Sequence, residues 1–185
     1  MFGFMRKGIF IVGTIGILAL SLIDWATKTF AIERFMDGHS THIIPFVDFF
    51  LHRNPGITFD IPVPISIVAF VTVGILLFLI DRASASYSSD SAVTLSAIAV
   101  IAGATNNLVD RIVHGFTTDY LMFFSTSIIN GSDVLIVLGV ASIFWYTRHN
   151  PHALRNFIQP SPPKYGVISR MFRSVIRFVC NPRHS

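Results

Sequence analysis

The chain contains long runs without a charged residue. Ile61 to Ile80 and Ser91 to Val109 carry no Asp, Glu, Lys or Arg, and Gly8 to Ile23 is equally free of charge. Between Tyr120 and Thr147 the single charge is Asp133. A helix needs about 20 apolar residues to cross the hydrocarbon core of a bilayer. These runs predict a membrane protein, because a soluble globule of 185 residues could not bury them all.

The runs predict an all-α membrane protein with a bundle of four transmembrane helices. The helices are expected at about 8–30, 62–80, 91–109 and 131–147, within one membrane-embedded domain of residues 1–150. Only 13% of the residues are charged, whereas a soluble domain carries about 25%. Two alternatives are a soluble protein with long core helices and a cleaved signal peptide at the first run. The apolar pattern continues to Ile32, which favours a retained helix.

Basic residues lie at both ends of the chain. Arg6 and Lys7 precede the first helix, and the bases after the fourth are Arg148, Arg155, Lys164, Arg170, Arg173, Arg177 and Arg183. Cytoplasmic loops are enriched in Lys and Arg, so both termini are expected in the cytoplasm. Residues 151–185 are predicted to form a basic cytoplasmic tail. Its apolar spacing from Val167 to Val179 indicates an amphipathic helix on anionic lipid, or alternatively a poorly ordered segment.

Two charges interrupt the first predicted helix. Asp24 and Lys28 are four residues apart, so they share a helix face and can pair. A charge inside a spanning helix is costly and is a functional candidate by default. The pair is either a structural ion pair near the outer end of the helix or a direct part of a site.

Further polar residues gather at the outer ends of the third and fourth helices. They are Asn106, Asn107, Asp110, Arg111, Asp119, Asn130 and Asp133. Asn130 is the expected N-cap of the fourth helix, and the helix dipole alone could explain Asp133 in its first turn. A solvated loop would explain Asp119. Neither reading explains why both acids lie in, or at the edge of, a 28-residue stretch with no other charge.

Paired carboxylates suggest a specific chemistry. Two Asp side chains held close together share one proton, because both cannot easily ionise. One can then act as base toward water while the protonated one polarises a carbonyl, which hydrolyses a peptide bond. The sequence has no H-E-x-x-H, no G-x-S-x-G and no P-loop. His39 and His42 could bind a metal, but they lack obvious further ligands. We therefore expect no metal and no cofactor.

Five blocks of this sequence, taken together and in order, resemble the lipoprotein signal peptidases (signal peptidase II), which are bacterial membrane aspartyl proteases. Asp24 to Lys28 resembles D-x-x-x-K, and Asn54 to Phe59 resembles N-x-G-x-A-F. Gly103 to Arg111 resembles G-A-x-G-N-x-x-D-R. Thr117 to Tyr120 resembles V-V-D-F, and Ile129 to Asp133 resembles F-N-x-A-D. Each block alone is weak, but their order on four predicted helices is specific.

The resemblance implies a set of site residues. Asp119 and Asp133 correspond to the catalytic dyad. Substrate-binding or site-supporting roles are implied for Asp24, Lys28, Asn54, Gly56, Asn107, Asp110, Arg111 and Asn130. The resemblance also implies a small β-rich extracytoplasmic platform from the loop around 35–60, with Val47 to Leu51 and Ile57 to Ile61 as its best strand candidates.

The implied function is removal of signal peptides from diacylglyceryl-modified prolipoproteins by a cut before the lipidated Cys. The implied place is the outer face of the bacterial inner (plasma) membrane, with membrane lipids and no nucleic acid as partners. Four residues depart from the family pattern by adding polarity or bulk: Thr58, Asn106, Tyr120 and Ser132. A non-catalytic relative that binds signal peptide or lipid, and a small proton-coupled transporter, are the alternatives. Which Asp holds the proton at rest stays open.

Overall fold

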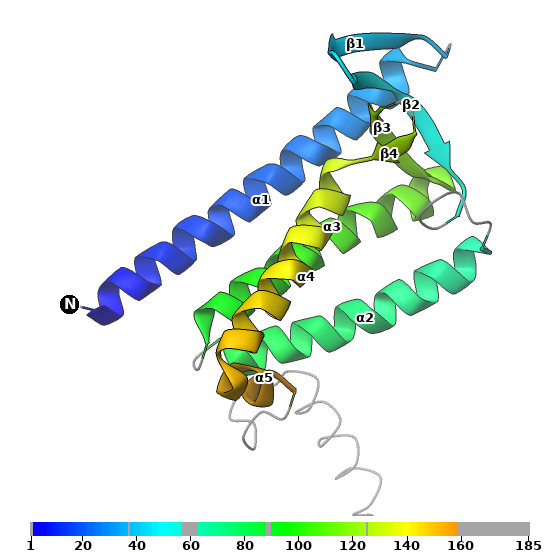
Figure 1. Ribbon diagram of the computed structural model, residues 1–185. Coiled ribbons are helices and arrows are strands. Elements are labelled where there is room, and N and C mark those ends of the chain that lie inside the picture. Colours follow the sequence, from blue (N-terminus) through cyan, green and yellow to red (C-terminus); the bar gives the residue numbers. More distant parts are fainter. Residues whose placement is uncertain (1, 37, 57–62, 88–89, 125, 159–185) are drawn as a thin grey trace, which may run out of the picture.

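The computed structural model describes residues 2–36, 38–56, 63–87, 90–124 and 126–158. Helices dominate this part of the chain, and a small sheet lies at one end of them (Figure 1). In chain order the elements are α1 (Phe2–Arg34), β1 (Ser40–Ile44), β2 (Val47–Asn54), α2 (Ile65–Ser86), α3 (Ser91–His114), β3 (Thr117–Phe123), β4 (Ser127–Ile129), α4 (Gly131–His149) and α5 (Pro151–Ile158).

The four predicted helices are present, and each continues beyond its predicted C-terminal end. A charge-free run marks only the apolar part of a helix, whereas the helix itself continues to its cap. For α3 that cap is Gly115, whose left-handed φ of 79° and N–H bond to the Arg111 carbonyl end the helix. Three helices are long and apolar enough to cross a membrane: α1 from Lys7, α2 and α3. The 19-residue α4 is not among these three.

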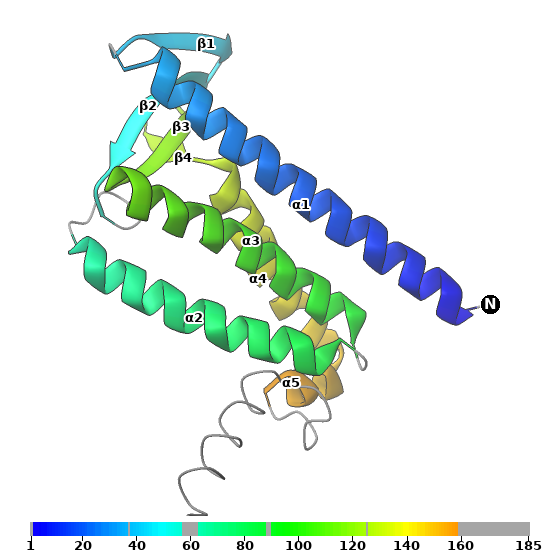
Figure 2. The ribbon, with the colours of Figure 1, turned by 180° about the vertical axis from the view of Figure 1, so that it is seen from behind.

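Helix α3 lies between α1 and α2 and also packs against α4 (Figure 2). The outward faces of the outer helices carry large apolar side chains. Leu22 on α1 is 66% exposed and Phe70 on α2 is 81% exposed. Exposed apolar surface that runs along whole helices is typical of a protein whose solvent is lipid. The packing therefore agrees with the membrane protein that the sequence predicts.

The sheet is antiparallel with the strand order β1-β2-β3-β4. The predicted strand at 47–51 is confirmed as part of β2, whereas the candidate at 57–61 lies outside the described residues. The strands β3 and β4 were not predicted, because β3 lacks the alternation of apolar and polar residues that marks a half-buried strand. The β2–β3 register places Asn54 opposite Thr117 and His52 opposite Asp119. Residues from two distant segments thus meet beside the helix ends.

Helix α5 covers the end of the bundle opposite the sheet (Figure 1). Its Ala153 and Phe157 are buried in one apolar cluster with residues of α2 and α3, including Leu79 and Val93. The predicted domain boundary at 150 falls just before this helix, so the first residues of the predicted tail contact the bundle. The predicted amphipathic helix further along the tail lies outside the described residues.

Gly103 allows α3 and α4 to approach closely. A Cβ at this position would lie 2.5 Å from the carbonyl oxygen of Ser132 and 2.9 Å from the Ile136 side chain. We expect Gly103→Ala to lower the free energy of unfolding by about 1–3 kcal/mol, because the α4 backbone must move. Thermal unfolding in detergent measures this. The control is Gly74→Ala on α2, where an added Cβ meets nothing within 4 Å, and equal melting temperatures would contradict the prediction.

Candidate active site

Asn130 connects Asp119 on β3 to Asp133 on α4. Its side-chain amide donates to Asp119 Oδ1 at 2.6 Å. Its side-chain oxygen accepts from the Asp133 backbone N–H at 2.9 Å, and its own backbone N–H donates to Asp133 Oδ2 at 3.2 Å. This reciprocal pattern is a capping box, so Asn130 is the N-cap that the sequence predicts. One residue therefore holds both carboxylates of the predicted dyad.

A second amide contacts each carboxylate. Asn54, at the end of β2, donates to Asp119 Oδ2 at 3.1 Å. Asn107 on α3 donates to Asp133 Oδ1 at 2.9 Å. The backbone N–H of Gly56 donates to Asn54 Oδ1 at 3.0 Å, which leaves the amide nitrogen of Asn54 to face Asp119. Each carboxylate thus accepts two N–H groups, one of them from Asn130.

The environment of Asp119 favours a bound proton. The residue is 3% exposed, and burial, the largest cause, raises the pKa of its carboxyl group to about 6. The negative charge of Asp133 raises this pKa further, while the hydrogen bonds from Asn54 and Asn130 lower it. Two like charges near each other cannot both ionise easily. The arrangement therefore suits one protonated and one ionised carboxyl group.

Lys28 lies between two buried carboxylates and reaches the site through Asn107. Its Nζ lies 3.6 Å from Asp24 Oδ2 and 3.3 Å from Asp110 Oδ2. It also donates to Asn107 Oδ1 at 2.6 Å, and Asn107 in turn holds Asp133. The ion pair on α1 predicted from the spacing is therefore present. It lies one side chain away from Asp133, through Asn107, and whether the pair is structural or part of the site stays a prediction.

Asp110 and Arg111 lie near the C-terminal end of α3 and have separate partners. Asp110 accepts the backbone N–H of Thr118 at 2.7 Å and the Thr118 hydroxyl at 3.1 Å. Arg111 donates to the carbonyl of Gly56 at 3.3 Å and to that of Asn107 at 3.4 Å. Asp110 thus fixes the start of β3 to α3, and Arg111 holds the backbone at Gly56, directly after the end of β2. The two side chains need no contact with each other, as the sequence indicates.

Thr118 is a site residue that sequence reasoning did not single out. It is 0% exposed and donates both its backbone N–H and its hydroxyl to Asp110. Its only signal in the sequence is its place directly before Asp119. The departures from the family pattern at Asn106, Tyr120 and Ser132 all donate hydrogen bonds to Asp24. The fourth departure, Thr58, lies outside the described residues.

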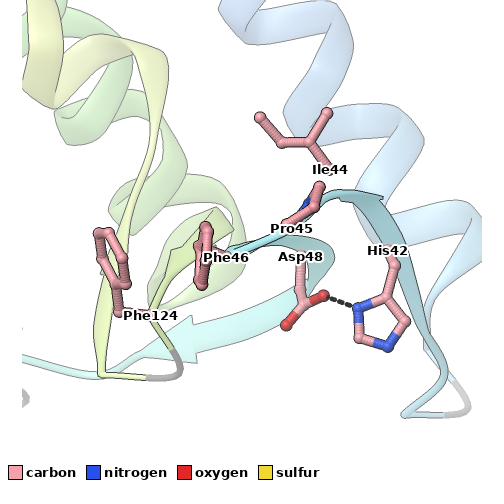
Figure 3. A pocket seen from close by; sticks show the side chains of 6 residues that line it. All are labelled: His42, Ile44, Pro45, Phe46, Asp48 and Phe124. Atoms are coloured by element: carbon pink, nitrogen blue, oxygen red, sulfur yellow. Dashed lines mark ion pairs between the residues drawn. The ribbon is translucent and has the colours of Figure 1, made fainter.

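A cavity of about 500 Å³ lies away from the dyad, at the turns of the sheet (Figure 3). It is lined by His42, Ile44, Pro45, Phe46, Asp48 and Phe124. His42 forms an ion pair with Asp48, and Phe46 stacks on Phe124. None of the lining residues is among the site residues that the resemblance implies, and His42, a metal-ligand candidate from the sequence, pairs here with Asp48. The site is therefore defined by the carboxylates and amides at the helix ends, not by this cavity.

Comparison with known proteins gives a consistent picture. The family model described as Signal peptidase (SPase) II matches residues 16–148. The lipoprotein signal peptidase of Bartonella henselae is 30% identical over 136 residues, which cover 70% of this chain and 83% of that protein. For the Brucella ovis lipoprotein signal peptidase the identity is also 30% over 136 residues, with 66% and 80% covered.

The fold also resembles solved structures. A bacterial membrane enzyme determined by the in meso method aligns with a TM-score of 0.65 at 22% identity, over 78% of this chain and 90% of that one. A second such structure aligns with a TM-score of 0.62, also at 22% identity, over 77% and 94%. At this identity the likeness concerns the fold alone.

Proposed function

The chain belongs to the signal peptidase II family, the lipoprotein signal peptidases, and from that membership we propose that it is an aspartic protease with Asp119 and Asp133 as its catalytic groups. It is a bacterial membrane protease that removes signal peptides from prolipoproteins. The observation that carries the proposed dyad is the bridge that Asn130 makes between the two carboxylates.

In the proposed mechanism Asp119 starts with the shared proton, because burial raises its pKa to about 6. Asp133 takes a proton from a water molecule whose oxygen attacks the scissile carbonyl carbon. Asp119 gives its proton to the carbonyl oxygen, so a neutral tetrahedral diol forms. The C–N bond then breaks as the nitrogen takes the proton from Asp133, and Asp119 recovers its proton from a hydroxyl of the diol. Both carboxyl groups return to their starting states.

Asn54, Asn107 and Asn130 hold the dyad during these steps. Their N–H groups fix the orientation of each carboxylate, which is the part of catalysis that positioning supplies. Lys28 supports the site indirectly through its hydrogen bond to Asn107. Asp110 supports it indirectly through its hydrogen bonds from Thr118. Arg111 holds the backbone at Gly56, directly after β2, by donating to its carbonyl.

We place the dyad at the outer face of the membrane, with α4 as the fourth span and both termini in the cytoplasm. The N-terminal end of α1 and α5 lie at the end of the bundle away from the sheet (Figure 1). Four of the described bases, Lys7, Arg82, Arg148 and Arg155, belong to that end. The sequence after α5 carries five more bases and no acid, which supports a cytoplasmic side there. The signal helix would reach the site from the lipid, and the acyl chains of the diacylglyceryl group would stay in the bilayer. Residues 1–150 would be the membrane domain and residues 151–185 a basic cytoplasmic tail.

Cleavage of a purified diacylglyceryl prolipoprotein by the full-length chain in detergent tests this function. We expect a product whose N-terminus is the lipidated Cys, identified by mass spectrometry. The matched control substrate is the same precursor without the diacylglyceryl group, which should remain intact. Equal cleavage of both precursors would contradict the proposed substrate. Binding without cleavage would favour the non-catalytic reading.

The proposed proton on Asp119 predicts a pH dependence. Its raised pKa means that the protonated form is present below about pH 6 and is lost above it. We therefore expect kcat/KM to fall by up to about tenfold per pH unit above that value. Asn54→Ala removes a hydrogen bond that lowers this pKa, so the falling limb should move to higher pH. A kcat/KM that is flat or rises between pH 6 and pH 8 in the wild type would contradict the assignment.

A further inference from the structure

The carboxylate of Asp24 is buried and accepts three hydrogen bonds. Ser132 Oγ donates to Oδ2 at 2.5 Å and the Tyr120 hydroxyl donates to Oδ1 at 2.8 Å. Asn106 Nδ2 donates to Oδ2 at 3.3 Å, and Asp24 is 2% exposed. Lys28 supplies the balancing charge. Through this one group α1 is joined to α3, β3 and α4.

Two of the three donors are the chain neighbours of the dyad. Tyr120 follows Asp119 on β3, and Ser132 precedes Asp133 on α4. Successive side chains of a strand point to opposite faces, so Tyr120 holds the strand from the side opposite Asp119. The backbone of each catalytic aspartate is thus tied, one residue away, to the same carboxylate.

The contact also anchors the first turn of α4. The Tyr120 hydroxyl accepts the backbone N–H of Gly131 at 3.0 Å while it donates to Asp24. N–H groups in the first turn of a helix have no partner within the helix, and a carboxylate there is favoured by the helix dipole. A Cβ at Gly131 would lie 2.8 Å from Asp24 Oδ1 and 2.9 Å from the Tyr120 hydroxyl. The glycine therefore permits this close approach.

We propose that Asp24, Tyr120 and Ser132 form a positioning clamp that sets the separation between Asp119 and Asp133. The proposal rests on the proposed function of that dyad. The two hydroxyls stand where the resemblance expects Phe and Ala, and a buried hydroxyl without a partner is costly. Both hydroxyls donate to one carboxylate, which offsets that cost in this chain. The three residues act through the dyad, so they are positioning residues and not catalytic ones.

The clamp is tested by Tyr120→Phe, Ser132→Ala and the double variant in the full-length enzyme, with a diacylglyceryl prolipoprotein as substrate. Each change removes one hydroxyl and adds no bulk. A displacement of about 1 Å can lower a rate about 100-fold, so each single variant should lower kcat by about 10-fold or more while KM changes less than about 2-fold. The double variant should be little worse than either single one, because residues of one network are not additive. The falling limb of the pH profile should shift, since the repulsion between the two carboxylates depends on their separation.

Tyr87→Phe and Ser96→Ala are the matched controls. Tyr87 is 58% exposed, and the Ser96 hydroxyl donates to the Ala92 carbonyl within its own helix, so both variants should keep the wild-type kcat. If the clamp variants have a lower melting temperature but an unchanged kcat and pH profile, the clamp proposal is wrong. The assignment of Asp119 and Asp133 as the catalytic dyad is then unaffected. An inactive wild type would overturn the dyad and the clamp together.

Discussion

Asp119→Asn and Asp133→Asn are each expected to abolish signal-peptide cleavage, with kcat lowered by about 10³-fold or more. The amide has nearly the shape of the carboxyl group, but it can neither accept the proton of the attacking water nor give a proton to the carbonyl. The Asp119→Asn change would remove the carboxyl group that, because of its raised pKa, carries the proton. The Asp133→Asn change would remove the carboxylate base that Asn107 and Asn130 orient. The measurement is single-turnover cleavage of a purified diacylglyceryl prolipoprotein in detergent.

The matched control for the dyad is Asp48→Asn. Asp48 lies on β2 in the same sheet and pairs with His42 beside the cavity, so its loss should leave kcat within about 2-fold of the wild type. Thermal unfolding of all three variants separates loss of chemistry from loss of fold. Retained cleavage by either dyad variant would show that the catalytic assignment is wrong. Asp24 and Asp110 would then be the next candidates for the catalytic groups.

The helices were predictable because their signal is local. About 20 apolar residues in sequence are enough to indicate a spanning helix, and the N-cap Asn130 is a short-range signal of the same kind. The i,i+4 spacing of Asp24 and Lys28 likewise predicts a pair that the structure contains. The helix ends were less predictable, because a helix can carry polar residues beyond its apolar run.

The partners within the site were not predictable from local pattern. Asn54 and Asp119 are 65 positions apart, and Lys28 and Asn107 are 79 apart. Such contacts depend on how helices pack and on the β2–β3 register, which neither composition nor periodicity encodes. The order of the motif blocks indicated that these residues serve one site, but it did not indicate which amide holds which carboxylate. The bonds from Tyr120 and Ser132 to Asp24 had no signal in the sequence beyond being departures from a pattern.

Lys28→Met should produce the largest loss of stability in the molecule. Lys28 is 3% exposed and is the shared partner of two buried carboxylates, Asp24 and Asp110. Removing one partner of a buried ion pair costs about 3–5 kcal/mol, because the remaining charge is left uncompensated. For a chain of this size that loss lowers the melting temperature by roughly 6–20 °C. Thermal unfolding in detergent gives the measurement, and Lys7→Met at the exposed start of α1 is the control.

A double variant identifies the cause of this loss. Asp110→Asn removes one of the two charges that Lys28 neutralises. Its single oxygen can still accept the Thr118 backbone N–H, and its new NH2 group can donate to the Thr118 hydroxyl, so the contact with Thr118 is kept. If uncompensated charge dominates, Lys28→Met combined with Asp110→Asn should be less destabilised than the sum of the two single variants. Strict additivity would instead attribute the effect to lost packing of the lysine stem and its bond to Asn107. In that case the cation would act on the dyad through Asn107 alone, and its charge would have no separate role in holding α1 to α3.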